Sequence, residues 1–303
     1  MKSMRIPLII ALGVAIIGII LGSFFDLQIS SAIASANNGL GLTISAIGPM
    51  IGFMAVAAMG GGFISFIIKG KYHIAFKILF GVLGAACFGV SLKYPAGEWF
   101  GINGFYGAAP EWVGYLIVLL PEAAAGVGGY FLFKDNKNDK LWIIFCIIIA
   151  ILLATLAGSI NLLKGIMHRP RFRLLATTDV VSFHNWWEPC KDYKDLMATY
   201  GFAKDNFKSY PSGHTAEASI ILVAVTFLPF AGEKFKKYQM PLFYAACGLI
   251  VIVAFARILA AAHFLSDVST GATLMIGLTV IVNEVVMRVK PLQVEEQKEE
   301  SKE

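Results

Sequence analysis

Three short clusters in this chain combine residue types that could bind an anion and react with it. Residues 164–171 read KGIMHRPR, residues 210–214 read YPSGH, and Arg257 precedes His263 and Asp267. Basic side chains attract anions, and a histidine with a carboxylate four residues later can act as a base or a nucleophile. The clusters therefore predict a site that holds an anion next to an activated imidazole.

The first cluster places Lys164 and Arg171 seven residues apart, a spacing that returns to nearly the same face of a helix. Pro170 disfavours a helical residue 169, so Arg171 need not follow that periodicity strictly. Taken alone, the cluster also fits basic residues that snorkel at a membrane surface. The spacing alone leaves both interpretations open for Lys164 and Arg171, and Arg169 is a candidate accessory residue.

The second cluster lies directly before an apolar stretch. Ser212 is a good N-cap for a helix that starts there, Gly213 lets the backbone approach a ligand, and amides at a helix start bind anions. The alternative is an ordinary cap beside an interfacial His214. We expect accessory roles for Tyr210 and Glu217, although a favourable charge at a helix start explains Glu217 equally well.

The third cluster requires a turn in the chain. Six residues of continuous helix would put Arg257 and His263 about 120° apart, so both face one site only if the chain turns tightly within residues 259–262. His263 and Asp267 lie four residues apart and share a helix face. A carboxylate there can fix the tautomer of the imidazole and strengthen it as a base or nucleophile. A structural ion pair is the alternative.

Together, the order and spacing of the three clusters resemble the type 2 phosphatidic acid phosphatase superfamily, which also includes glucose-6-phosphatase and the vanadium haloperoxidases. The resemblance covers about residues 141–288. Two positions depart from the family pattern. Phe172 stands where a proline usually follows Arg171, and Ala256 stands where a serine usually precedes Arg257. Neither departure removes a charged or nucleophilic member.

The resemblance implies that His263 attacks phosphorus to form a phosphohistidine, while Asp267 holds its imidazole. His214 would protonate the leaving oxygen and later help to activate water. The groups that would bind the phosphate oxygens are Lys164, Arg171, Arg257, Ser212 and the amide of Gly213. Phosphoryl transfer depends mainly on positioning and charge stabilisation, so three cations can serve where many enzymes use magnesium. We therefore expect a metal-independent phosphatase with no metal site and no cofactor.

The composition predicts the elements that position these residues. Of 303 residues, 57% are hydrophobic and 15% are charged, and the mean hydropathy is +0.70. Soluble domains carry about 25% charged residues, which argues against a cytosolic, disordered or nucleic-acid-binding protein. We expect an all-α polytopic membrane bundle of about eight transmembrane helices with a six-helix phosphatase-like core. The eight apolar segments cover residues 6–24, 44–68, 76–93, 112–133, 141–163, 214–231, 241–260 and 264–288.

The placement of lysine and arginine predicts the orientation. The connections 25–43 and 94–111 contain neither residue, whereas the connections on the opposite side are basic. We therefore expect the protein to lie in the cell membrane. Both of its termini would be in the cytoplasm, and the candidate site would be on the extracytoplasmic side. The outward segment 164–213 is an exception because it is basic, and an anionic ligand would explain why.

Residues 1–133 contain four of the predicted spans, two more than the resemblance requires. Residues 141–288 form the expected catalytic core, and 172–209 form an extracytoplasmic loop. The segment 291–303 has mixed charge and no apolar face, so we expect a disordered cytoplasmic tail. The sequence does not choose between substrate access and an oligomer interface for the additional spans, and it leaves the oligomeric state open.

A site at the outer membrane interface suits a lipid phosphate or diphosphate. Phosphatidic acid, phosphatidylglycerophosphate and undecaprenyl diphosphate are substrates of this type. Two other classes stay open: a non-hydrolytic relative, either a lipid phosphotransferase or a vanadate-dependent oxidase, and a transporter that binds phosphate without chemistry. Release of free phosphate separates the hydrolase from the transferase.

Overall fold

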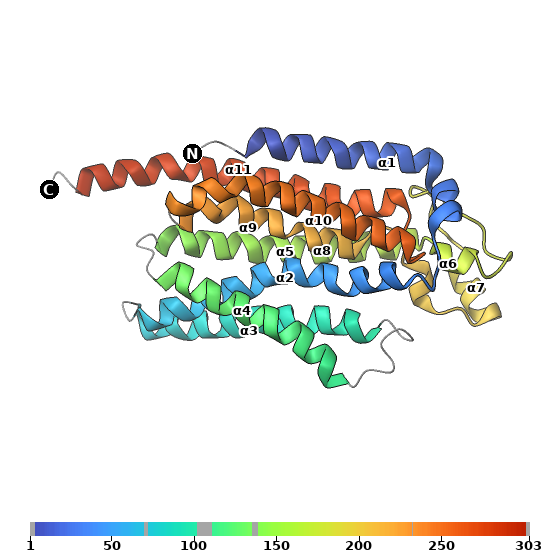
Figure 1. Cartoon of the computed structure of the whole chain (residues 1–303), viewed down its shortest axis with the longest axis horizontal. Coiled ribbons are helices and arrows are strands. Elements are labelled where there is room, and N and C mark those ends of the chain that lie inside the picture. The colour runs from blue at the N-terminus through green and yellow to red at the C-terminus, as the bar shows by residue number, and fades with distance from the viewer. Residues whose placement is uncertain (1–3, 70–71, 102–110, 135–138, 232, 301–303) are drawn as a thin grey trace.

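The computed structural model describes residues 4–69, 72–101, 111–134, 139–231 and 233–300, and within these ranges it contains helices and no strands. The long helices run side by side along the longest axis of the molecule (Figure 1). They are α1 (Arg5–Ile33), α2 (Gly39–Ile68), α3 (Ile74–Gly101), α4 (Glu111–Lys134), α5 (Asp139–Met167), α10 (Gln239–Leu259) and α11 (Leu265–Glu300). The all-helical prediction is confirmed.

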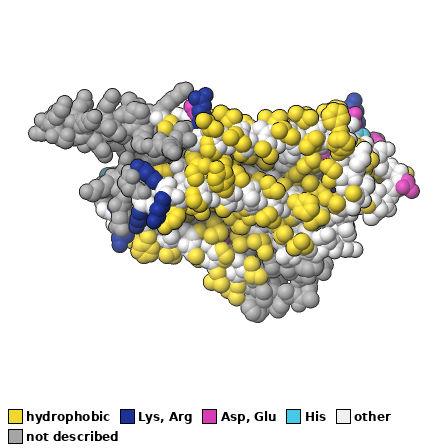
Figure 2. Space-filling model, turned by 45° about the horizontal axis from the view of Figure 1, so that its top comes forward, with side chains coloured by type: hydrophobic (Ala, Val, Ile, Leu, Met, Phe, Trp, Pro, Cys, Tyr) yellow, Lys and Arg dark blue, Asp and Glu magenta, His cyan; other side chains and the backbone are white. Residues whose placement is uncertain are grey.

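Six of the described helices are long and apolar enough to cross a membrane, which indicates an integral membrane protein. They lie in α1, α2, α3, α5, α10 and α11. Neither α4 nor the segment predicted as the sixth span is among these six, so the count of eight stays a prediction. Figure 2 shows hydrophobic side chains over the middle of the bundle, with lysine and arginine gathered toward one end.

The segment predicted as the sixth span, 214–231, folds as two short helices. They are α8 (Gly213–Ser219) and α9 (Ile221–Phe227), and the 3-10 helices η2 (Leu228–Ala231) and η3 (Glu233–Tyr238) follow them. Ser212 is the N-cap of α8, as the sequence predicts, because its hydroxyl accepts from the amide of Thr215 at 3.4 Å. The candidate residues of the second cluster thus lie at a capped helix start.

The connection from α5 to α8 packs over one end of the bundle. It contains α6 (Phe172–Leu175), α7 (Tyr193–Tyr200) and the 3-10 helix η1 (Lys204–Phe207). Figure 1 shows it at the end of the bundle opposite to the end of α11. Its own apolar cluster consists of Leu174, Val181, Cys190 and Phe207. The connection is therefore a packed layer of protein above the helix ends.

The helix α1 lies along α11 in close contact (Figure 1). A β-carbon added to Gly22 would lie 2.6 Å from the backbone nitrogen of Ser266, which is closer than any real contact. On the other flank, α2 packs against α3 and α4, and Gly129 of α4 lies against the backbone of Ala58. Small residues therefore let these helices approach closely.

The last helix, α11, continues to Glu300. It includes most of the segment 291–303 for which the sequence predicts disorder. Glutamate, glutamine and lysine dominate that segment and are good helix formers, so the helix can continue beyond the apolar part. Residues 301–303 of the predicted tail, and 102–110 of the predicted connection 94–111, lie outside the described residues.

Candidate active site

The three sequence clusters lie at the end of the bundle that the α5–α8 connection covers (Figure 1). Lys164 is in the last turn of α5, and Arg257 is in the last turn of α10. A β-carbon added to Gly213 at the start of α8 would lie 3.8 Å from Nζ of Lys164. The amide of Ser212 donates to the backbone carbonyl of Asp267 at 3.0 Å, so the second and third clusters touch directly.

The turn between α10 and α11 brings Arg257 and His263 together. The helix α10 ends at Leu259, and Ala261 has a left-handed conformation with φ of 52°. The amides of Ala262 and His263 both donate to the carbonyl of Arg257, each at 3.2 Å. The expected tight turn within residues 259–262 is confirmed, and it folds the chain back so that both side chains reach one region.

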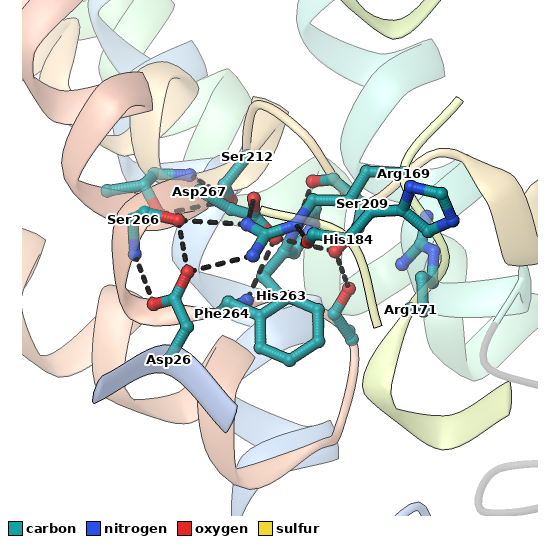
Figure 3. Close-up of polar contacts among 12 residues, drawn as sticks. Asp26, Arg169, Arg171, His184, Ser209, Ser212, His263, Phe264, Ser266 and Asp267 are labelled. Atoms are coloured by element: carbon teal, nitrogen blue, oxygen red, sulfur yellow. Dashed lines mark hydrogen bonds and ion pairs between the residues drawn. The ribbon is translucent and has the colours of Figure 1, made fainter. Parts of the chain in front are cut away.

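The closest partner of the His263 ring is a residue that the sequence analysis did not single out. Nδ1 of His263 lies 2.5 Å from the carbonyl oxygen of Ser209 and 3.7 Å from Oδ2 of Asp267 (Figure 3). The longer distance exceeds a hydrogen bond. The hydroxyl of Ser209 donates to Oδ2 of Asp267 at 2.5 Å, so Asp267 supports the imidazole through Ser209. Ser209 directly precedes the second cluster, so it could have been identified in the sequence from that position.

The environment of His263 favours the neutral imidazole. Burial lowers the pKa of His263 well below its ordinary value. Asp267 opposes this shift in pKa, whereas the guanidinium groups of Arg257 and Arg171 add to it. The side chain is 1% exposed. A neutral imidazole retains the lone pair that a nucleophile requires.

Arg169, for which the sequence analysis expected an accessory role, is fully buried and lies between Asp26 and Asp267 (Figure 3). Nε donates to the carbonyl of His184 at 2.8 Å, and Nη1 donates to Asp267 at 2.6 Å and to Ser266 at 2.8 Å. Nη2 donates to Asp26 at 2.9 Å. All three nitrogens of the guanidinium thus bond to protein groups. Arg169 therefore holds the residues of the site in place rather than binding substrate.

Asp26 was also missed by the sequence analysis. It is the only carboxylate in α1, and a charged residue in an apolar helix is a functional hypothesis by default. That signal was available in the sequence. The partner of Asp26 was not, because Ser266 is 240 positions away.

Arg171 lies at the edge of the site and pairs with Asp205. Its Nε donates to the backbone carbonyl of Asp205 at 2.9 Å, and its Nη2 lies 3.1 Å from the carboxylate. Arg173 donates to the same carboxylate at 2.6 Å. Burial acts to raise the pKa of Asp205, but the surrounding cations, first Arg171 and then Arg173, lower this pKa below its ordinary value. Asp205 thus occupies a position beside the predicted phosphate-binding cations.

The other predicted residues surround the same region. His214, in the first turn of α8, is 8% exposed, and Arg257 is 6% exposed. Lys164 interacts electrostatically with Arg171, Arg257 and Glu217. Tyr210 is buried and stacks on Trp186 with 5.8 Å between ring centroids. The structure therefore brings all the sequence-predicted residues to one end of the bundle.

One group of three side chains in the part of the chain that the structure describes could hold a metal ion. The ligand atoms of His184, Cys190 and Asp192 lie within 4.8 Å of one another in the α5–α8 connection. Burial, followed by the hydrogen bond to Asp192, raises the pKa of the Cys190 thiol to about 12. The thiol of Cys190 donates to the carboxylate of Asp192 at 3.3 Å, so two of the three side chains already satisfy each other, and we assign no metal here.

The comparison with protein families agrees with this geometry. The profile of the PAP2 superfamily matches residues 139–291, slightly more than half of the chain. The chain belongs to the PAP2 superfamily. The matched region begins at the start of α5 and ends within α11, so it contains all three clusters and excludes α1 to α4. No curated protein and no solved structure gives a significant match. The family resemblance predicted from the sequence is confirmed, and membership implies a phosphate-ester substrate.

Proposed function

We propose that this PAP2-family protein hydrolyses the phosphate monoester or diphosphate of a lipid through a phosphohistidine at His263. The observation that carries the proposal is the 2.5 Å contact between Nδ1 of His263 and the carbonyl of Ser209. A carbonyl oxygen only accepts, so the ring proton of a neutral imidazole resides on Nδ1. Nε2 then keeps its lone pair, and this atom is the nucleophile.

In the first step, Nε2 of His263 attacks phosphorus and the bond to the leaving oxygen breaks. His214, at the start of α8, supplies the proton that the leaving oxygen needs. In the second step, His214 removes a proton from water, and the resulting hydroxide attacks the phosphohistidine. Inorganic phosphate leaves, and both imidazoles return to their starting protonation states.

The charge that develops on the phosphate oxygens is balanced by fixed cations. Lys164, Arg171 and Arg257 come from three different helix ends, so they approach the phosphate from different sides. The hydroxyl of Ser212 and the amide of Gly213 add donors at the start of α8. Because preorganised charges need no reorganisation during the reaction, this set stabilises the transition state without a metal ion.

An apolar groove beside the helices supports a lipid substrate. It has a volume of about 360 Å³ between α2, α9 and α10, and its walls are almost entirely apolar. The residues that line it include Ile51, Ala224, Leu228, Ala245 and Leu249. We propose that it receives an acyl or prenyl chain while the phosphate reaches His263. In this proposal α4 and the α8–α9 pair complete eight spans, and the site faces away from the cytoplasm.

The test is release of inorganic phosphate by the purified protein in detergent with excess chelator. The substrates are phosphatidic acid, phosphatidylglycerophosphate, undecaprenyl diphosphate and one soluble phosphoester. We expect release from at least one lipid, slower release from the soluble compound, and loss of activity of at least about a thousandfold in His263→Ala. His73→Ala is the matched control because His73 is exposed directly before α3.

The outcomes separate the remaining functions. Turnover that survives chelation and disappears in His263→Ala supports hydrolysis through the phosphohistidine. Consumption of lipid phosphate without free phosphate, but with a phosphorylated alcohol acceptor, would identify a phosphotransferase instead. A folded protein that consumes no lipid would overturn the enzymatic proposal.

A further inference from the structure

Asp26 is a buried carboxylate that belongs to α1, outside the region that matches the PAP2 superfamily. The residue is 2% exposed, although α1 is otherwise among the most apolar helices of the chain. Burying a carboxylate costs several kcal/mol unless donors compensate it. A single charge in this position therefore requires an explanation from its contacts.

The contacts of Asp26 hold the first turn of α11. Oδ1 accepts from the amide of Ser266 at 2.9 Å, and Oδ2 accepts from the hydroxyl of the same residue. Amides in the first turn of a helix have no partner within the helix, and negative charge is favourable there. Asp26 thus caps the start of α11 from a different helix. The residue that it holds, Ser266, directly precedes Asp267.

The second contact of Asp26 leads to the centre of the site. Oδ2 also accepts from Nη2 of Arg169 at 2.9 Å, and Nη1 of Arg169 lies 2.6 Å from Oδ1 of Asp267 (Figure 3). The amide of Ser266 and the guanidinium of Arg169 can only donate, so Asp26 must offer acceptor oxygens to both. One guanidinium is therefore shared by two buried carboxylates.

From Asp267 the chain of contacts continues to the imidazole. Its Oδ2 accepts from the hydroxyl of Ser209, whose carbonyl lies against Nδ1 of His263. The positions of Asp267 and Ser209 therefore decide the direction in which Nε2 points. Any shift of Arg169 or of the first turn of α11 is transmitted to the nucleophile.

We propose that Asp26 is a positioning residue for the phosphoryl-transfer site: it fixes Arg169 and the start of α11, and thereby aligns Asp267 and His263. The inference rests on the proposed function of His263. It assigns α1, which the family match excludes, a part in catalysis. Asp26 itself touches neither the substrate nor the reacting nitrogen.

The first experiment compares Asp26→Asn with Ser30→Ala in the phosphate-release assay. Asparagine keeps the size of the side chain but removes its charge and turns a donor toward Arg169 or Ser266. Ser30 lies one turn further along α1, is fully buried, and its hydroxyl has no hydrogen-bond partner among the described residues. We expect kcat of Asp26→Asn to fall about tenfold with KM within about twofold of wild type, and Ser30→Ala to match wild type.

The kcat and KM values separate positioning from folding. They are measured on the monodisperse folded fraction, so a variant that only folds less well keeps its kcat per folded molecule. A kcat of Asp26→Asn within about twofold of wild type would overturn the inference. An equal loss in Ser30→Ala would also overturn it, because the effect would then belong to α1 packing in general.

The second experiment tests the position of the nucleophile by measuring the binding of vanadate and phosphate, without turnover. Vanadate forms a bond to an attacking imidazole nitrogen and imitates the transition state, whereas inorganic phosphate binds only as an anion. We expect Asp26→Asn to weaken vanadate binding about tenfold and to change phosphate binding less than about twofold. Unchanged vanadate binding, or an equal loss for both anions, would contradict the positioning role.

This second arm also separates the two proposals. If the wild-type protein releases no phosphate from any lipid, the proposed hydrolysis fails. The dependence of vanadate binding on Asp26 is then still measured, and its presence or absence decides the inference independently.

A third pair of variants perturbs the same contact from the backbone side. Gly22→Ala would place a methyl group 2.6 Å from the backbone nitrogen of Ser266 and 2.7 Å from Asp26, whereas Gly13→Ala on the same helix would meet nothing within 4 Å. We expect Gly22→Ala to lose kcat and vanadate affinity as Asp26→Asn does, and Gly13→Ala to retain both. Wild-type values in a folded Gly22→Ala would contradict the inference.

Discussion

The backbone carbonyl of Ser209 lies 2.5 Å from Nδ1 of His263. The hydroxyl of the same serine donates to Asp267, and the carbonyl of Asp267 accepts from the amide of Ser212. The segment before α8 and the first turn of α11 are therefore held together at the imidazole. Asp267 acts on His263 indirectly, because Ser209 lies between them.

Replacing Ser209 by alanine removes the hydroxyl but leaves the carbonyl that contacts His263. Asp267 loses one of its donors and no longer fixes the position of that carbonyl. Because a hydrogen bond to a charged group contributes about 1.5–3 kcal/mol, we expect kcat to fall about tenfold or more with little change in KM. Steady-state phosphate release measures both constants.

Ser219→Ala is the control for that variant. Ser219 is also buried in the same region of the chain, but its hydroxyl donates to the carbonyl of Thr215 within its own helix. Its kcat should equal that of wild type. A Ser209→Ala protein with wild-type kcat would show that Asp267 needs no serine to support the imidazole.

Asp205→Asn should increase the affinity of the site for phosphate. The carboxylate of Asp205 now attracts Arg171 and repels an incoming anion, whereas the bond from Nε of Arg171 to the backbone carbonyl is independent of that side chain. We expect KM for the lipid phosphate and the inhibition constant of inorganic phosphate to fall by about threefold to tenfold. Competitive inhibition kinetics give both values.

Asp195→Asn is the matched control because Asp195 is an exposed carboxylate on α7 in the same connection. Both of its constants should stay at the wild-type values. A higher KM in Asp205→Asn would mean that the carboxylate serves to hold Arg171 in place for the substrate.

The loss of activity on the acidic side of the pH profile should have a low midpoint. His263 must be neutral to attack, and burial lowers its pKa below the ordinary value of 6.5. A lowered pKa means that the imidazole becomes protonated only at more acidic pH, so activity is lost only there. We expect kcat/KM to fall with a midpoint below pH 6.5, measured with two lipid phosphates.

The two substrates separate the enzyme from the phosphate group, whose second ionisation also lies near pH 6. Substrates with different phosphate pKa values should share the limb that belongs to His263. A common midpoint at or above pH 6.5 would contradict the neutral buried imidazole.

Filling the apolar groove should discriminate between substrates by chain length. Ala245 lines the groove and is exposed on α10, so Ala245→Phe can enter the groove without displacing core side chains. We expect KM to rise at least about fivefold for a long-chain lipid phosphate, with little change for a short-chain or soluble one. Val251→Phe, on an exposed part of α10 outside the groove, should leave both unchanged. Equal effects on all substrates would argue that the chain binds elsewhere.

The sequence by itself determined the helices and the reactive residues. Hydropathy over about 20 residues is a local property, so the apolar segments correspond to helices in the structure. The spacing of His263 and Asp267 and the cap at Ser212 are also local, because they follow from the geometry of one helix or one helix start. The turn after Leu259 was required by the angle between Arg257 and His263, and it is present.

Only the tertiary structure decided which groups meet those residues. Asp26 contacts Ser266 across 240 positions, Ser209 contacts His263 across 54, and Asp205 contacts Arg171 across 34. No periodicity relates residues so far apart, because their contact depends on how separate helices pack and how the connection above them folds. An isolated carboxylate in an apolar helix shows that a partner is needed, since an unpaired buried charge is costly. The packing of α1 against α11 brings Ser266 to Asp26, and the fold of the connection after α5 brings Arg169 to it.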